Sequence, residues 1–140
     1  NVNKLRPDAY IEGILVQRMA PIGTEVIVGI NNDPQLGPCV LVGMGGVFVE
    51  VFRDVQIRLA PVSETEALDM LSQLKADKLL AGYRGYPPCD REALAKLIVA
   101  VSEIAVEYKD SLVELDINPV FVYEKGVCAV DALIVFDECP

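Results

Sequence analysis

The chain has 140 residues, a formal net charge of −9 and no histidine. The length fits one domain, and the acidic balance disfavours nucleic acid or an anionic membrane as a bulk partner, since both attract cationic surfaces. The absence of histidine excludes Ser–His and Cys–His catalysis and mixed zinc sites within this chain, but an anionic nucleotide bound through a metal remains compatible with the charge.

Apolar residues make up 52% of the chain, and no apolar run approaches the roughly 20 residues that span a bilayer. This apolar excess favours either a dense core or an apolar surface that belongs against another part of a larger protein. The four cysteines are scattered, with no Cys-x-x-Cys spacing. They are typical of free thiols in a reducing cytosol, so we expect a cytoplasmic protein.

The first half of the chain predicts a sheet. Residues 1–10 are polar and are expected to be an edge segment, whereas residues 11–140 are expected to form the domain. Runs of β-branched residues, separated by Gly, Pro and Asn-Asp turn signals, predict strands at 13–19, 24–30, 39–42, 47–51 and 55–59. The short connections favour antiparallel neighbours.

Two helices are predicted next. Ser63 and Glu66 form a capping-box pattern at the start of the first helix, and Asp90 can cap the second. The second helix carries one apolar stripe, at positions 94, 97, 98, 101, 104, 105 and 108. With the strands, this predicts an α+β fold, a mainly antiparallel sheet packed by two helices.

The last part of the chain predicts a hairpin with an acidic face. Acid and aliphatic residues alternate from Glu114 to Asn118, and a turn at 124–126 leads into an apolar run. In that hairpin Asn118 lies opposite Asp131, so Glu114, Asp116 and Asp131 are expected to converge with the amide of Asn118. Such oxygen donors suit Mg²⁺, although an ordinary solvated acidic face is the alternative interpretation.

Other residues are weaker candidates for a nucleotide site. The glycines at 43–46, including Gly45 and Gly46, could approach a phosphate closely or simply make a tight turn. Arg58 could stabilise a transferred phosphate, and Gln17 and Glu25 could accept hydrogen bonds from ribose or adenine. Each of these, and Glu50, has the alternative of being an ordinary surface side chain.

Taken together, six motifs in order resemble the ADP-forming acyl-CoA ligases, which include acetate–CoA ligase and relatives of the succinyl-CoA synthetase β chain. The resemblance runs from about Tyr10 to Phe136 and rests on the segments 15–19, 23–29, 33–38, 43–51, 58–61 and 114–119 with Asp131-Ala132.

The resemblance implies the C-terminal lobe of an ATP-grasp domain, with Mg²⁺ and ATP or ADP as cofactors. It implies Asn118 and Asp131 as Mg²⁺ ligands, with Asp116 helping through water. The strand that holds Gln17 and Met19 would meet adenine.

The resemblance further implies that Glu25 approaches the ribose. It places Gly45, Gly46 and Glu50 on the phosphate side, with Arg58 in a catalytic role there. One departure is Arg18, where related chains often carry glutamate, so a side-chain role is not carried over to it.

The parent reaction would interconvert acyl-CoA, ADP and phosphate with acid, CoA and ATP through a phosphohistidine. The expected partners are the remainder of the ligase, meaning the other ATP-grasp lobe and the segments that bind CoA and carry that histidine. The chain alone is expected to be inactive and to self-associate. The alternative is a degenerate ligase-like binding region of a protein acetyltransferase.

Overall fold

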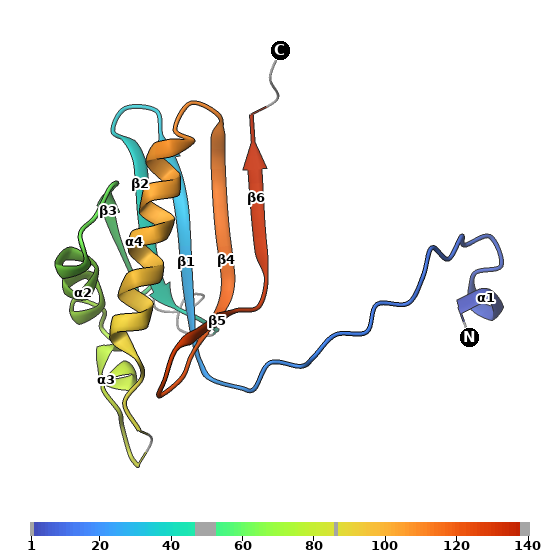
Figure 1. Ribbon diagram of the computed structural model, residues 1–140, viewed down its shortest axis with the longest axis horizontal. Coiled ribbons are helices and arrows are strands. Elements are labelled where there is room, and N and C mark those ends of the chain that lie inside the picture. The colour runs from blue at the N-terminus through green and yellow to red at the C-terminus, as the bar shows by residue number, and fades with distance from the viewer. Residues whose placement is uncertain (1, 47–52, 86, 138–140) are drawn as a thin grey trace.

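The structure is a computed structural model that describes residues 2–46, 53–85 and 87–137. Within these residues an antiparallel sheet of six strands has the order β3-β2-β1-β4-β5 (Figure 1). The sixth strand, β6, also pairs with β4, at residues 112–117, whereas β5 pairs with residues 120–122. The strands are β1 Thr24–Asp33, β2 Gly37–Met44, β3 Val55–Leu59, β4 Leu112–Val122, β5 Val127–Ala129 and β6 Ala132–Phe136. The helices are α1 Val2–Leu5, α2 Glu64–Ser72, α3 Asp77–Leu80 and α4 Arg91–Glu107.

The two long helices cover one face of the sheet (Figure 1). Alternate residues of the central strands point toward them and are fully or almost fully buried, among them Val28, Ile30, Val40 and Val42. The α+β fold with an antiparallel sheet packed by helices, predicted from the sequence, is therefore confirmed. We call the opposite side of the sheet, which no described helix covers, the open face.

Both predicted helix starts are confirmed. The Ser63 Oγ accepts from the Glu66 amide at 3.2 Å, while the Ser63 amide donates to Glu66 Oε2 at 2.8 Å. At α4, Asp90 Oδ1 accepts from the Ala93 amide at 2.9 Å. The short helices α1 and α3 were not predicted.

The predicted apolar stripe of α4 is only partly right. Ile104 and Tyr108 remain 37% and 43% exposed, whereas Ser102 is buried. Ser102 can face the core because its hydroxyl is fully used: it donates to the Val99 carbonyl at 2.7 Å and accepts from the Val62 amide at 3.1 Å.

The strand predicted at 13–19 is not present. Residues 6–23 form no strand and extend away from the sheet (Figure 1). A strand needs a neighbour for its backbone N–H and C=O groups. Among the described residues, no backbone hydrogen bond joins residues 10–23 to another segment. The strand predicted at 47–51 lies outside the described residues.

The closing hairpin forms in the predicted register. β5 and β6 both pair with β4, with Val120 opposite Ala129 and Ile117 opposite Ala132. The link between them stays hydrogen bonded to β4, because the Val130 amide donates to the Pro119 carbonyl at 3.0 Å.

Candidate metal and nucleotide site

One row of side chains crosses the open face and includes Asp116. Cross-strand partners share a face, so the pairings place Ile57, Leu41, Gly29, Asp116 and Leu133 side by side from β3 to β6. Asp116 is half-buried between Gly29 and Leu133. The carboxylate therefore lies on a largely apolar surface.

Asn118 and Asp131 are direct neighbours, as the hairpin count predicted. The backbone N–H of Asn118 donates to the backbone carbonyl of Asp131 at 3.1 Å. Both side chains are exposed, and Asp131 Oδ1 accepts from the Ala132 amide at 2.9 Å, which orients the carboxylate. In β4 the register against β1 shifts between Val26 and Val28, so the β4 backbone is irregular beside Asn118.

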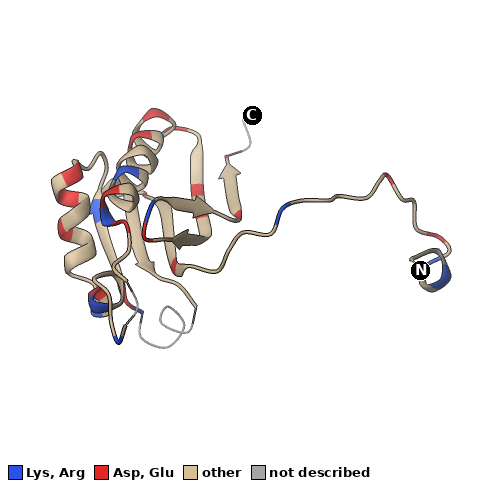
Figure 2. Cartoon of the chain, turned by 60° about the horizontal axis from the view of Figure 1, so that its bottom comes forward, with Lys and Arg blue, Asp and Glu red and all other residues tan. Residues whose placement is uncertain are grey.

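The expectation that three carboxylates converge there is wrong. Glu114 lies opposite Val135, four residues from Asn118 and therefore about 13 Å from the Asn118–Asp131 pair along the strand. Within residues 2–46, 53–85 and 87–137, no group of three acidic or cysteine side chains could hold a metal ion. Figure 2 shows acidic positions spread over the helices and the sheet rather than gathered in one place.

The expected donors are two carboxylates and one side-chain amide: Asn118 and Asp131 are direct neighbours, and Asp116 lies two residues from Asn118 along β4. These are hard oxygen donors, and Mg²⁺ in nucleotide sites is held by one or two carboxylates together with water and phosphate oxygens. The residues present therefore fit Mg²⁺ bound jointly with a nucleotide, and they do not form an all-protein cage.

Glu25, Gly45 and Gly46 are brought together at the start of β1 and the end of β2. A Cβ on Gly45 would lie 2.7 Å from the Glu25 Cβ, so glycine is required for this approach. The Gly45 amide donates to the Glu25 carbonyl at 2.7 Å, which means that it is engaged rather than directed at a phosphate. Glu50 lies outside the described residues.

The structure does not bring Arg58, which was expected on the phosphate side, to the open face that carries Asp116. Arg58 pairs with Val40, whose side chain is buried under the helices, so both point away from the open face. The guanidinium donates to Gln73 Oε1 at 2.8 Å and lies 3.5 Å from an Asp69 carboxylate oxygen. The alternation of β3 directs Arg58 toward α2, the opposite side of the sheet from Asp116.

The structure does not bring Gln17 or Met19 to the acidic residues. Both are exposed, Met19 to 84%, in the segment that extends from the sheet. Their predicted adenine contacts remain a prediction.

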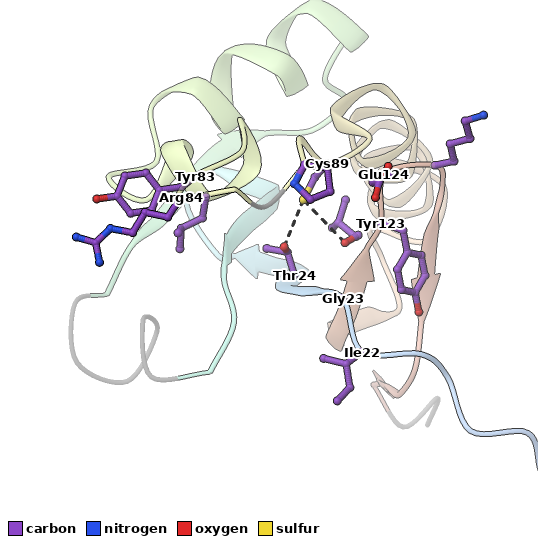
Figure 3. Close-up of a pocket in the computed structure, with 12 residues that line it drawn as sticks. Ile22, Gly23, Thr24, Tyr83, Arg84, Cys89, Tyr123 and Glu124 are labelled. Atoms are coloured by element: carbon purple, nitrogen blue, oxygen red, sulfur yellow. Dashed lines mark hydrogen bonds between the residues drawn. The ribbon is translucent and has the colours of Figure 1, made fainter.

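The sequence did not predict a cavity of about 730 Å³, which lies at the end of the sheet where β1 begins. Figure 3 shows Cys89 and Thr24 at its centre, with Tyr83 on one side and Tyr123 on the other. The cavity is lined by Ile22, Gly23, Thr24, Leu79, Tyr83, Arg84, Pro87, Cys89, Val122, Tyr123, Glu124 and Lys125. The available signal was the loop at 82–88, with its glycines, tyrosines and prolines, but nothing in that pattern placed it beside residues 22–24.

Three cysteines are free thiols, as expected, and Cys139 lies outside the described residues. Burial raises the pKa of the Cys39 thiol, and the nearby Asp33 charge acts in the same direction. The Cys89 thiol donates to Thr24 Oγ1 at 3.3 Å. In the part of the chain that the structure describes, every helix is too short or too polar to cross a bilayer.

Comparison with known proteins decides the family. The family model described as "ATP-grasp domain" matches residues 1–136. The chain belongs to the ATP-grasp family. Among curated proteins, this ATP-grasp chain is 47% identical over 135 residues to the acetate–CoA ligase [ADP-forming] I subunit beta of Pyrococcus furiosus, and the match covers 96% of this chain but 58% of that relative.

A second relative is longer still. The acetate–CoA ligase [ADP-forming] I of Archaeoglobus fulgidus is 46% identical over 138 residues, which is 99% of this ATP-grasp chain and 20% of that protein. The chain therefore spans about three-fifths, or less, of these two relatives.

Solved structures of one archaeal enzyme have the same fold. The dinucleotide-forming acetyl-coenzyme A synthetase 1 of Ca. Korarchaeum cryptofilum, in complex with coenzyme A, Ca-AMPCP and HgCl⁺, has a TM-score of 0.86 and 49% identity, over 97% of this chain and 59% of that one. The same enzyme in complex with coenzyme A and Mg-AMPPCP has a TM-score of 0.80 and 48% identity, over 84% and 55% of the two chains.

Proposed function

We propose that this chain provides the metal-binding surface and part of the nucleotide-binding surface of an ADP-forming acyl-CoA ligase. The observation that carries the proposal is the pairing of Asn118 with Asp131 across the hairpin, next to the half-buried Asp116 on the open face. The relatives named above are ADP-forming ligases, and their solved structures include complexes with metal-bound nucleotide analogues.

In this proposal the parent enzyme interconverts acyl-CoA, ADP and phosphate with acid, CoA and ATP. Bound Mg²⁺ would neutralise phosphate charge, and Asn118, Asp116 and Asp131 would hold and orient the metal–nucleotide complex. Because this chain has no histidine, a transferred phosphoryl group carried on histidine must reside on another part of the enzyme.

Several exposed aliphatic side chains on the open face support a partner surface. Ile57, Leu59 and Leu133 are all more than half exposed. We propose that this face lies against the remainder of the ligase in the complete enzyme, in the cytoplasm. Self-association of the isolated chain stays a prediction, to be examined by light scattering at high concentration.

The test uses the complete ligase with Asn118→Ala and Asp131→Ala. We expect the Mg²⁺ concentration for half-maximal activity to rise at least about tenfold in each variant, because removal even of groups that only support metal ligands typically weakens binding tenfold or more. Calorimetry of Mg–ADP binding should show the same loss.

Asn31→Ala is the matched control. Asn31 is exposed and pairs with Glu114, on the same face but at the other end of β1. Unchanged Mg²⁺ dependence in Asn118→Ala and Asp131→Ala, or an equal change in Asn31→Ala, would contradict the proposed function. That result would favour the alternative interpretation, in which the acidic residues form an ordinary solvated surface.

A further inference from the structure

The segment that carries Gln17 and Met19 is tied to the sheet by one side chain. The Tyr123 hydroxyl donates to the Pro21 carbonyl at 2.9 Å. Within the described parts of the chain, no other hydrogen bond joins residues 10–22 to the sheet or the helices. This contact lies just before the chain enters β1 at Thr24.

The backbone at Gly23 is fitted closely to the same side chain. A Cβ at this position would lie 2.9 Å from Tyr123 Cε1 and 3.0 Å from the Val122 carbonyl oxygen. Any larger residue would therefore displace the tyrosine ring or the strand. Figure 3 shows Tyr123 beside Gly23, with Ile22 pointing away beyond it.

Tyr123 is itself held rigidly by the helix layer. Its amide donates to the Gly126 carbonyl at 3.1 Å, and its carbonyl accepts from the Asp90 amide at 2.7 Å. The Asp90 carboxylate in turn accepts from the Gly126 amide at 2.7 Å and from the Ala93 amide at 2.9 Å. The tyrosine is thus fixed by the β4–β5 turn to the first turn of α4.

The phenol is a donor under ordinary conditions. Desolvation, with a contribution from Cys128, raises the pKa of Tyr123 above its usual value near 10. The hydroxyl therefore keeps its proton throughout the neutral range, and the Pro21 carbonyl can only accept.

We propose that Tyr123 is a positioning residue that fixes the direction in which residues 11–22 leave the sheet. This inference rests on the proposed function and on the expectation from the family resemblance that Gln17 and Met19 meet adenine. With a fixed Pro21 carbonyl, the segment that carries those residues starts from one position and in one direction relative to the sheet. Without it, only a fraction of molecules has the binding arrangement, and the apparent nucleotide affinity falls by that fraction.

Tyr123→Phe in the complete ligase tests the proposal, because the ring stays and only the hydroxyl is lost. We expect hydrogen exchange at the first amides of β1, residues 24–26, which pair with β4, to become about 3- to 10-fold faster, as for the loss of one hydrogen bond. The KM for the nucleotide should rise by a similar factor, while kcat at saturating nucleotide stays within about twofold. Tyr108→Phe is the matched control, since Tyr108 lies at the far end of α4, and it should change neither measurement.

Gly23→Ala is the second variant. It should produce the same pattern more strongly, because the added Cβ presses on both the Tyr123 ring and a backbone oxygen. The proposal is overturned if Tyr123→Phe leaves exchange at residues 24–26 unchanged. It is also overturned if kcat falls while the nucleotide KM does not move, since that is the pattern of a residue with a merely structural role.

The two proposals fail in different ways. Failure of the Mg²⁺ test with a faster-exchanging Tyr123→Phe would reject the proposed function while still showing that Tyr123 anchors the segment. Faster exchange without any change in nucleotide KM would reject the positioning role, even if Asn118 and Asp131 bind the metal.

Discussion

The two faces of the sheet are built from the same strands and differ in almost every other respect. The helix-covered face carries Val40, Ile30 and Leu115 in one row, all buried. The adjacent row on the open face carries Leu41, Gly29 and Asp116. One residue step along each strand thus separates a dry core from a surface that mixes glycine, aliphatic and acidic side chains.

The buried core that stabilises the fold therefore lies on one face of the sheet, and the half-buried carboxylate of Asp116 lies on the other. On the helix side, side chains are large and complementary, and even Arg58 is engaged by Gln73 and Asp69 of the helix layer. On the open side, Gly29 and Gly43 allow neighbouring atoms to approach the backbone closely, and Asp116 lies directly opposite Gly29.

The largest expected effect compares one substitution on the two faces. Leu94 in α4 is fully buried, whereas Leu133 in β6 is 58% exposed in the open-face row. Leu94→Ala should lower the free energy of unfolding by about 2–5 kcal/mol, because it removes core contacts and leaves a cavity. Leu133→Ala should cost about 0.5 kcal/mol. Urea unfolding of both variants measures the difference, and equal losses would contradict the division between the faces.

A smaller effect is expected from adding a methyl group at a glycine of the open face. A Cβ at Gly29 would lie 2.8 Å from the Leu115 carbonyl oxygen, a backbone atom that cannot move alone. Gly29→Ala should therefore destabilise the chain by about 1–3 kcal/mol, although glycine-to-alanine changes at compatible sites are stabilising.

Gly13→Ala is the control, because a Cβ there has no neighbour within 4 Å. Its effect on the free energy of unfolding should stay within about 0.5 kcal/mol. A neutral Gly29→Ala would show that the open face yields to an added methyl group and is not a rigid floor.

Local patterns in the sequence predicted the parts whose interactions are local. The capping box at Ser63 and the Asp90 cap depend on residues three apart, and both formed. The hairpin register needed only a turn position and a count, so the pairing of Asn118 with Asp131 was accessible. The family resemblance added the chemical meaning of that pair.

The errors arose where distant parts of the chain decide the outcome. The run at 13–19 has the composition of a strand, but composition does not supply the neighbouring backbone that a strand requires. The phosphate-side place of Arg58 was taken from the family resemblance. Its face depends on the register of β3 against β2, which is not visible in the sequence of β3 itself. The Tyr123 contact with Pro21 joins residues about 100 positions apart, for which no local pattern exists.

The smallest effect on stability is expected from a substitution of Asp90, at the seam between the helix layer and the sheet, where the start of α4 contacts the β4–β5 turn. Asp90 accepts from the Gly126 amide in the β4–β5 turn and from the Ala93 amide in α4. Asp90→Asn replaces one accepting oxygen with a donor, so one of these two amides loses its partner. We expect the melting temperature at pH 7 to fall by about 2–4 °C. Asp110→Asn should leave it unchanged, since that exposed carboxylate has no hydrogen-bond partner among the described residues.

The pH dependence of the Asp90 variant provides a sharper test than its melting temperature alone. The Gly126 amide, and secondly the Ala93 amide, lower the pKa of Asp90 in the folded chain. Because the folded pKa lies below the unfolded value of about 3.9, the stabilisation is present above that value and is lost as the pH falls through the folded pKa. The difference in melting temperature between wild type and Asp90→Asn should therefore shrink as the pH is lowered from 7 toward 3. A difference that stays constant over this range would show that the Asp90 charge does not stabilise the seam.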